Sequence, residues 1–196
     1  MPHGETRKQR TILMRIIAGT NKGGRIRVAK KGTRPTKGLV REAIFDVLGA
    51  KVIDAAILDV FAGSGALGIE ALSRGARSCF FIEKQPKELF RNIQSLSFME
   101  KTRVIIGDFR FGLKKLKGTR FSLIFLDPPY GKGYLRMAIN LIGEYGLIED
   151  NGIIIAEHAV EDTIELPKMF SVQKIKRYGD TAVSFVTTNP TLEAEG

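Results

Sequence analysis

The sequence has little of several features that commonly decide the class of a protein. A single cysteine, Cys79, among 196 residues excludes an internal disulfide and a cysteine-rich metal site. No apolar run approaches the roughly 18 residues that suggest a membrane span. Residues 1–10 are polar and basic and lack the apolar stretch of a secretory signal. We therefore expect a cytoplasmic protein with no metal and no membrane partner, whose length suits one domain.

Acidic residues are scarce in the first part of the chain. Residues 1–56 hold 13 Lys and Arg but only 4 Asp and Glu, so almost all of the net charge of +10 lies there. The remaining residues are nearly neutral. A basic segment on a neutral body favours a polyanionic partner, although a solvated basic terminus would have the same composition.

Residues 57–70 read as a buried strand, a glycine turn and the start of a helix. Ile57, Leu58 and Val60 are strand formers that suit a sheet covered on both faces. Gly63 and Gly65 then allow a sharp turn that directs the free amide groups of the next helix toward whatever lies above the strand end. The stretch predicts a binding site for a nucleotide or a nucleotide-like cofactor.

The identity of that cofactor is left open by the turn alone. Residues 63–68 match the dinucleotide pattern G-x-G-x-x-G, and Glu83 follows where a ribose-binding acid is expected, which supports NAD or FAD. Two acids favour S-adenosylmethionine instead. Asp59 could orient the loop or meet the cationic amino-acid end of the cofactor through water, and Asp108 ends a later strand where it could bind an adenine amino group.

The motif Asp127-Pro128-Pro129-Tyr130 favours a methyl-transfer reaction. Two consecutive prolines lack amide donors and restrict the preceding residues, so the loop can present carbonyl groups at fixed positions. The Asp127 carboxylate and the Pro128 carbonyl could accept the two hydrogens of an exocyclic base amine, while Tyr130 stacks on the base. A β-turn with a purely structural role is the alternative. The place of the loop, directly after a predicted strand beside the cofactor-binding site, favours the functional role.

Strand and helix patterns alternate after residue 56, which predicts a parallel sheet. Before it, alternating apolar and charged residues with an intervening turn predict a basic β-hairpin. A helix is expected to follow Arg34-Pro35-Thr36, with Arg41 away from its apolar face and able to reach solvent or ligand. The basic residues predicted to contact RNA are Arg25, Arg27, Lys30, Lys31, Arg34 and Arg41.

Several separated motifs resemble those of one known family. Asp127-Pro128-Pro129-Tyr130 is similar to the signature of methyltransferases that act on exocyclic amines of adenine or guanine, and residues 59–65 resemble their cofactor loop. More narrowly, the chain resembles the RsmD-type enzymes, which methylate a guanine N2 amine in the 16S (small-subunit) ribosomal RNA of bacteria. Four further motifs carry this resemblance: Arg15-Ile-Ile-Ala-Gly19, Arg34-Pro-Thr36, Val40-Arg-Glu-Ala-Ile-Phe45 and Arg177-Tyr-Gly-Asp-Thr181.

The resemblance implies a Rossmann-like class I S-adenosylmethionine-dependent methyltransferase. This α/β fold has a seven-stranded, mostly parallel sheet whose last strand is antiparallel, with a small amino-terminal hairpin and helix added. We expect residues 1–13 to be a disordered basic tail, residues 14–50 to be the RNA-facing hairpin and helix, and residues 51–190 to be the methyltransferase domain.

The resemblance also implies the site residues. The target base would contact Asp127, Pro128, Pro129 and Tyr130. S-adenosylmethionine would contact Thr36, Asp59, Ala62, Gly63, Gly65, Glu83, Asp108 and Phe109. The partner would be ribosomal RNA or an assembly intermediate of the small ribosomal subunit, and the enzyme would act as a monomer.

Two other functions remain open at this point. A DNA adenine methyltransferase would share the Asp127-Pro128-Pro129-Tyr130 signature, but such enzymes usually carry a sizeable target-recognition segment, for which this chain has no spare length. An NAD-dependent oxidoreductase, or a nucleotide-binding module without catalysis, would explain the glycine turn. Either of these would leave the loop of residues 127–130 and the basic segment of residues 1–56 unexplained.

Overall fold

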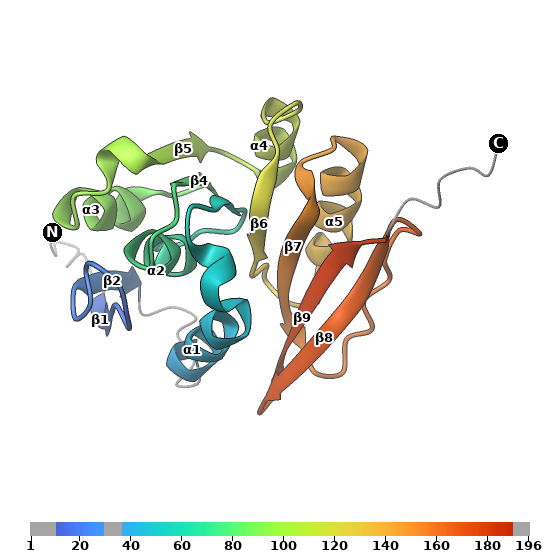
Figure 1. Cartoon of the computed structure of the whole chain (residues 1–196), viewed down its shortest axis with the longest axis horizontal. Coiled ribbons are helices and arrows are strands. Elements are labelled where there is room, and N and C mark those ends of the chain that lie inside the picture. The colour runs from blue at the N-terminus through green and yellow to red at the C-terminus, as the bar shows by residue number, and fades with distance from the viewer. Residues whose placement is uncertain (1–10, 30–36, 190–196) are drawn as a thin grey trace, which may run out of the picture.

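A twisted seven-stranded sheet forms the centre of the protein, as seen in a computed structural model that describes residues 11–29 and 37–189 (Figure 1). The strand order is β5-β4-β3-β6-β7-β9-β8. Strands β3 to β7 pair in parallel, whereas β9 is antiparallel to both of its neighbours. The strands are β3 (Ala56–Asp59), β4 (Ser78–Glu83), β5 (Thr102–Ile106), β6 (Phe121–Leu126), β7 (Ile148–Ala159), β8 (Phe170–Tyr178) and β9 (Thr181–Thr188). The predicted fold class is confirmed, including the antiparallel last strand.

Helices cover both faces of this sheet because its strands are apolar on both sides. Alternate residues of β3 show the division: Ile57 belongs to one buried cluster and Leu58 to the other. The first cluster contains side chains of α1 (Lys37–Leu48), α2 (Ala66–Ser73) and α3 (Lys87–Ser95), and the second those of α4 (Phe109–Lys115) and α5 (Tyr134–Glu144). Two short 3-10 helices, η1 (Gly49–Val52) and η2 (Met99–Lys101), complete the helices of the described residues. None of the helices in the described ranges is long and apolar enough to cross a membrane.

The predicted hairpin is present but begins earlier than expected. Strand β1 (Thr11–Arg15) pairs antiparallel with β2 (Arg25–Ala29), so residues 11–13 belong to a strand and the prediction of a tail through residue 13 was wrong at this point. Backbone pairing of Ile12 with Val28 and of Leu13 with Arg27 holds these residues in place. Residues 1–10 lie outside the described part of the chain.

Three polar side chains of helices α2 and α3 fix the hairpin to the rest of the fold. Glu70 is fully buried and accepts hydrogen bonds from the amides of Ile17 (2.9 Å) and Ala18 (3.0 Å). Ser73 donates to the Ala18 carbonyl. Asn92 accepts from the Arg27 amide (2.8 Å) and donates to the Arg27 carbonyl (2.9 Å). Buried polar groups are retained where they satisfy backbone groups in this way, so the hairpin is part of one folded unit with the sheet.

Asn92 also reaches the loop after β3, because its amide nitrogen donates to the Ser64 carbonyl at 2.9 Å. Asn92→Ala would leave that carbonyl and both backbone groups of Arg27 without this partner. We expect the free energy of unfolding to fall by about 1 to 3 kcal/mol or more, the cost of unsatisfied buried polar groups. Urea denaturation measures the change, and Asn140→Ala, at an exposed position of α5, is the matched control. Equal midpoints for the two variants would contradict a supporting role for Asn92.

Candidate functional site

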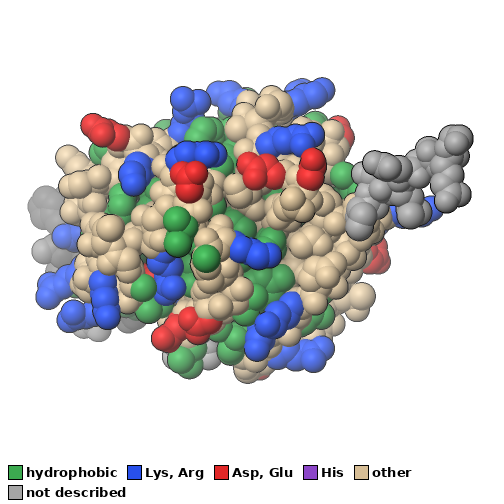
Figure 2. All heavy atoms as spheres, in the orientation of Figure 1, with side chains coloured by type: hydrophobic (Ala, Val, Ile, Leu, Met, Phe, Trp, Pro, Cys, Tyr) green, Lys and Arg blue, Asp and Glu red, His purple; other side chains and the backbone are tan. Residues whose placement is uncertain are grey.

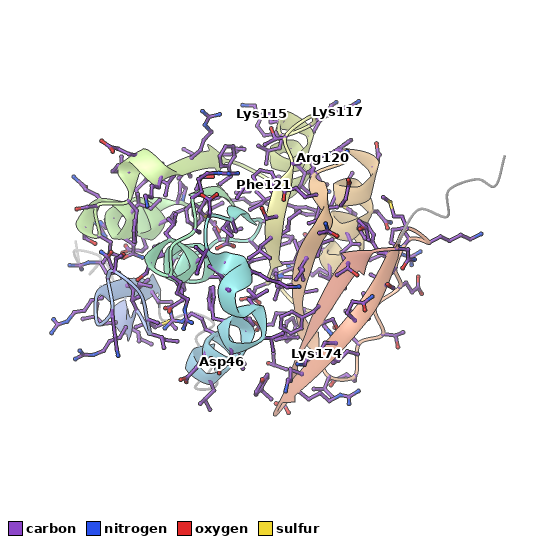
Figure 3. The ribbon with its side chains drawn as sticks, viewed as in Figure 1. Asp46, Lys115, Lys117, Arg120, Phe121 and Lys174 are labelled. Carbon is purple, nitrogen blue, oxygen red and sulfur yellow. The ribbon has the colours of Figure 1, made fainter. Side chains whose placement is uncertain are left out.

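A cavity of about 710 Å³ opens at the carboxyl ends of the parallel strands, which is where open α/β sheets bind ligands. Phe121 begins β6 near the top of the molecule in Figure 3, so the carboxyl end of that strand points toward the lower edge. The cavity walls come from the ends of β3, β4, β6 and β7 and from helix α1, which lies over the first buried cluster. Residues at or near the carboxyl ends of four neighbouring strands, β4, β3, β6 and β7, therefore line the same cavity.

The loop after β3 has the geometry that its glycines predicted. Gly63 (φ 55°) and Gly65 (φ 80°) adopt the left-handed conformation, and Gly65 is the residue before α2. Gly63 lines the cavity together with Ala62, whereas Gly65 packs inward: a Cβ there would lie 2.4 Å from Cδ1 of Leu89. Gly63 thus faces the ligand space, and Gly65 allows close packing of the loop on α3.

Asp59 orients this loop from below. Its side chain is buried, and Oδ2 accepts a hydrogen bond from the Gly68 amide at 3.2 Å, which ties the strand end to the first turn of α2. Burial raises the pKa of Asp59 to about 7, and the hydrogen bond from Gly68 partly opposes that rise. Of the two roles predicted for Asp59, orientation of the loop is the one seen directly, although the residue also lines the cavity.

Glu83 ends β4 and faces the same loop. One carboxylate oxygen accepts from the Gly63 amide at 2.7 Å, and the other accepts from the Gln85 amide at 2.9 Å. The side chain lines the cavity, and a carboxylate has more acceptor positions than these two bonds use. This is the placement that a ribose-binding acid requires.

Asp108 follows the end of β5, as predicted, and its carboxylate is engaged by neighbouring groups. It caps helix α4 by accepting from the Arg110 amide, and its carboxylate also pairs with the Arg110 side chain (2.7 Å) and with Lys84 Nζ (2.8 Å). These contacts, Arg110 first, hold the pKa of Asp108 well below its usual range. Its neighbours Gly107 and Phe109 line the cavity. The strand end therefore reaches the ligand space through the residues on either side of Asp108.

The Asp127-Pro128-Pro129-Tyr130 loop follows β6 directly and lines the cavity along its whole length. Tyr130 is half-buried, and its hydroxyl donates to Oε1 of Glu157 at 3.1 Å and lies 3.4 Å from Oγ1 of Thr181. Burial raises the pKa of Tyr130 to about 12, so the hydroxyl stays protonated at neutral pH. The ring is held from its far end and cannot turn freely away from the cavity.

Two residues of this site escaped the sequence analysis. Glu157 is the carboxyl-end acid of β7 and continues the series of strand-end acids, a signal that the sequence did contain. Thr181 begins β9 at the turn of the Arg177-Tyr-Gly-Asp-Thr181 motif. Its contact with Tyr130 joins segments 51 residues apart, so no local pattern announces it.

The predicted RNA-binding set divides into three groups. Arg25 and Arg27 are exposed on β2, and Figure 2 shows Lys and Arg side chains gathered at the lower left, over the hairpin. Lys30, Lys31 and Arg34, like the predicted cofactor residue Thr36, lie outside the described residues.

Arg41 was predicted to reach solvent or ligand, and the structure places it at the cavity and not on the outer surface. Only 4% of it is exposed; it donates to the Arg15 carbonyl and lies 3.8 Å from the buried Glu70 carboxylate. Two of its guanidinium nitrogens, Nε and Nη1, are buried without a hydrogen-bond partner, and the residue lines the cavity. Its charge therefore faces inward, toward the ligand space, and cannot pair with an RNA phosphate outside.

Within residues 11–29 and 37–189, no group of three or more His, Cys, Asp and Glu side chains is placed to hold a metal ion. His158 has a structural role, since its ring bonds to the Ala159 carbonyl (2.8 Å) and Ser184 Oγ (2.9 Å).

Comparisons with known proteins agree with this geometry. The family model described as Conserved hypothetical protein 95 matches residues 14–187. Ribosomal RNA small subunit methyltransferase D of Escherichia coli (strain K12) is 37% identical over 174 residues, which are 86% of this chain and 87% of that protein. The solved structure of yhhF from Escherichia coli matches with a TM-score of 0.81 at 36% identity, covering 91% of this chain and 99% of that one. SMU.776, solved in complex with SAH, shares the fold at 14% identity, with a TM-score of 0.68 over 95% of this chain and 57% of that one.

Proposed function

The chain belongs to the family described as Conserved hypothetical protein 95, and from this membership and its site we propose that it methylates a guanine exocyclic amine of small-subunit ribosomal RNA, with S-adenosylmethionine as methyl donor. The resemblance to RsmD-type enzymes drawn from the motifs is confirmed, and so is the assignment to the S-adenosylmethionine-dependent methyltransferases. The substrate is free ribosomal RNA or an assembling small subunit, and the enzyme works as a cytoplasmic monomer.

One observation carries this proposal: the cofactor loop and the Asp127-Pro128-Pro129-Tyr130 loop line the same cavity. A methyl donor bound at the first loop and a base held at the second would meet without any rearrangement of the strands. Proximity and orientation of two reactants can supply much of a rate enhancement when the donor is already activated. No general base of unusual basicity is required, because the amine becomes acidic once it has attacked.

The residues around the cavity fit S-adenosylmethionine by their chemistry. Glu83 presents acceptors for the ribose hydroxyls, and the buried Phe109 offers an apolar wall for the adenine. Arg41, with two unpartnered guanidinium nitrogens, suits the carboxylate at the amino-acid end of the cofactor. When bound, S-adenosylmethionine supplies an activated methyl group. Asp127 and the Pro128 carbonyl accept the amine hydrogens and orient the nitrogen lone pair, and Tyr130 stacks on the base.

The other candidate functions account for less of the cavity. An oxidoreductase would use the glycine loop and Glu83 but has no use for the Asp127-Pro128-Pro129-Tyr130 loop. Within the described ranges, no segment between the strands is long enough to form a separate target-recognition unit of the kind that DNA adenine methyltransferases carry. The proposed methyl transfer to RNA uses both loops and the exposed basic hairpin.

A thermal-shift comparison followed by methylation mapping tests the proposal. S-adenosylhomocysteine at 100 times its dissociation constant should stabilise the protein by about 2.7 kcal/mol, while NAD should give no shift. Tritiated methyl transfer to ribosomal RNA from a strain that lacks the gene, in naked RNA and in assembling subunits, should then label one nucleotide as N2-methylguanine. Stabilisation by NAD alone, or label on adenine or on DNA, would refute the proposal.

Glu83→Ala tests the cofactor site separately. Loss of charge-assisted hydrogen bonds to the ribose should weaken S-adenosylmethionine binding by about 1.5 to 3 kcal/mol, or roughly 10- to 150-fold. Isothermal titration calorimetry measures this, with the exposed Glu144→Ala on α5 as control. Equal affinities of the two variants would remove Glu83 from the site.

A further inference from the structure

We propose that Glu157 selects guanine as the target base by accepting a hydrogen bond from the guanine N1–H, an inference that rests on the proposed function and names the residue that sets its base specificity. Glu157 belongs to none of the motifs through which the chain was first interpreted. The place of Glu157 beside Asp127, the burial of its side chain and the chemistry of the two purines support this role.

Glu157 and Asp127 lie side by side at the cavity. Strands β6 and β7 are parallel, with Leu126 paired to Ala156, so Asp127, which directly follows β6, lies beside Glu157, the next residue of β7. Phe125 and Ile155, two residues earlier, both belong to the buried cluster under α1. Since side chains alternate along a strand, Asp127 and Glu157 project to that same face. Both line the cavity.

The Glu157 carboxylate is buried and lines the cavity. Glu157 is 7% exposed, and its Oε1 accepts from the Tyr130 hydroxyl. A carboxylate has about four acceptor positions, so it can accept hydrogen bonds from more than one donor. Glu157 also lines a second cavity of about 250 Å³, which shares Pro128, Pro129 and Tyr130 with the first. The side chain thus stands beside the loop that would hold the base, where the two cavities meet.

Guanine and adenine differ at N1, the ring nitrogen next to the exocyclic amine. Guanine carries an N1–H donor directly beside its N2 amine, whereas the N1 of adenine is an acceptor beside the N6 amine. A base whose amine is held by Asp127 would therefore offer its N1 to the adjacent Glu157. Guanine would donate to the carboxylate, but adenine would set a lone pair against a buried negative charge.

The cationic side chains among the described residues of the cavity are held by other acids. Arg41 and Lys84 are the cationic side chains among the described residues that line it. Arg41 lies against Glu70, and Lys84 pairs with Asp108. The end of the cavity formed by the Asp127-Pro128-Pro129-Tyr130 loop is rich in acceptors, which suits a base edge with two adjacent donors.

A simpler role would be to hold Tyr130 and nothing else, and the two roles predict different results with a modified base. The RNA fragment that contains the methylated guanine would be synthesised with guanine or with 2-aminopurine at that position. Because 2-aminopurine keeps the 2-amine but has an acceptor at N1, the wild-type enzyme should methylate the guanine fragment at least about 10- to 100-fold faster in kcat/KM.

Glu157→Gln should change that preference. Its amide can donate to the N1 of 2-aminopurine, so the rate on guanine should fall about 10-fold while the rate on 2-aminopurine holds or rises, and the ratio should narrow by 10-fold or more. Tyr130→Phe, which removes the hydroxyl bonded to Glu157, should lower both rates and leave the ratio unchanged. S-adenosylhomocysteine affinity and melting temperature, measured for both variants, report that each is folded.

An unchanged ratio for Glu157→Gln, with both rates lowered equally, would overturn the inference and leave Glu157 as a support for Tyr130. That result would not affect the proposed function, which the wild-type enzyme tests alone. A wild-type enzyme that methylates no guanine in ribosomal RNA would overturn the proposed function and this inference with it.

Discussion

Asp127→Ala is expected to lower the single-turnover rate of methyl transfer about 10²- to 10³-fold, the usual loss when one precisely placed polar group at a reacting centre is removed. S-adenosylmethionine affinity should stay unchanged, because the contacts expected for the cofactor lie at the ends of β3, β4 and β5. A loss of kcat without a loss of cofactor binding is the mark of a group that acts on the acceptor in the transition state.

The measurement is a single-turnover assay on saturating RNA, paired with calorimetry for the cofactor. Asp46→Ala is a suitable control, because Asp46 is an exposed acid of α1 that does not line the cavity; Figure 3 labels it near the lower edge of the molecule. Its rate should match that of the wild type. A near-normal rate for Asp127→Ala would mean that the Asp127-Pro128-Pro129-Tyr130 loop has only a structural role.

Most of the fold was predictable because the strands carry strong local signals. Strand β3 is buried at every position, β6 at all but one and β4 at half of its positions, so their apolar runs are strong signals. Strand β1 gave no such signal, because Ile12 and Leu13 are exposed and its order depends on backbone pairing with β2. Alternation of residue types predicted that a hairpin is present, but it did not show that the pairing extends back to residue 11.

The site was predictable where a residue's role is local and was missed where it is not. Gly63 and Glu83 followed from a turn and a strand end, and each lines the cavity. The position of Arg41 on its helix was correct, but the burial of its side chain depends on Glu70 in α2, which no helical pattern of α1 encodes. The cap that Asp108 forms on α4 is a local contact, whereas its predicted contact with the adenine stays a prediction.

The basic hairpin is the surface on which RNA binding should depend most. Arg25 and Arg27 are exposed on β2, and Lys30 and Lys31 follow in the sequence. The hairpin is linked to the cofactor loop through Asn92, but those hydrogen bonds use the backbone of Arg27 and the carbonyl of Ser64. Reversal of the four side chains to Glu should therefore preserve the hairpin and the affinity for S-adenosylmethionine.

Reversal of Arg25, Arg27, Lys30 and Lys31 to Glu should abolish RNA binding at moderate salt, because attraction to the phosphates becomes repulsion. Each phosphate contact of a single strand contributes a slope of about −0.7 in log K against log salt, so loss of four contacts should flatten the dependence by about 3 units. A filter-binding titration measures both quantities, at salt low enough to detect the variant.

The matched control reverses four basic residues at the far end of the sheet. Lys114, Lys115, Lys117 and Arg120 are exposed, and the last three lie at the end opposite the cavity in Figure 3. Their reversal changes the net charge of the protein by the same amount, so it reproduces any effect of overall charge on association. If the hairpin contacts RNA, the control keeps a steep salt dependence and most of the affinity. Parallel slopes and equal affinities for the hairpin variant, the control and the wild type would place the RNA-binding surface on another part of the protein.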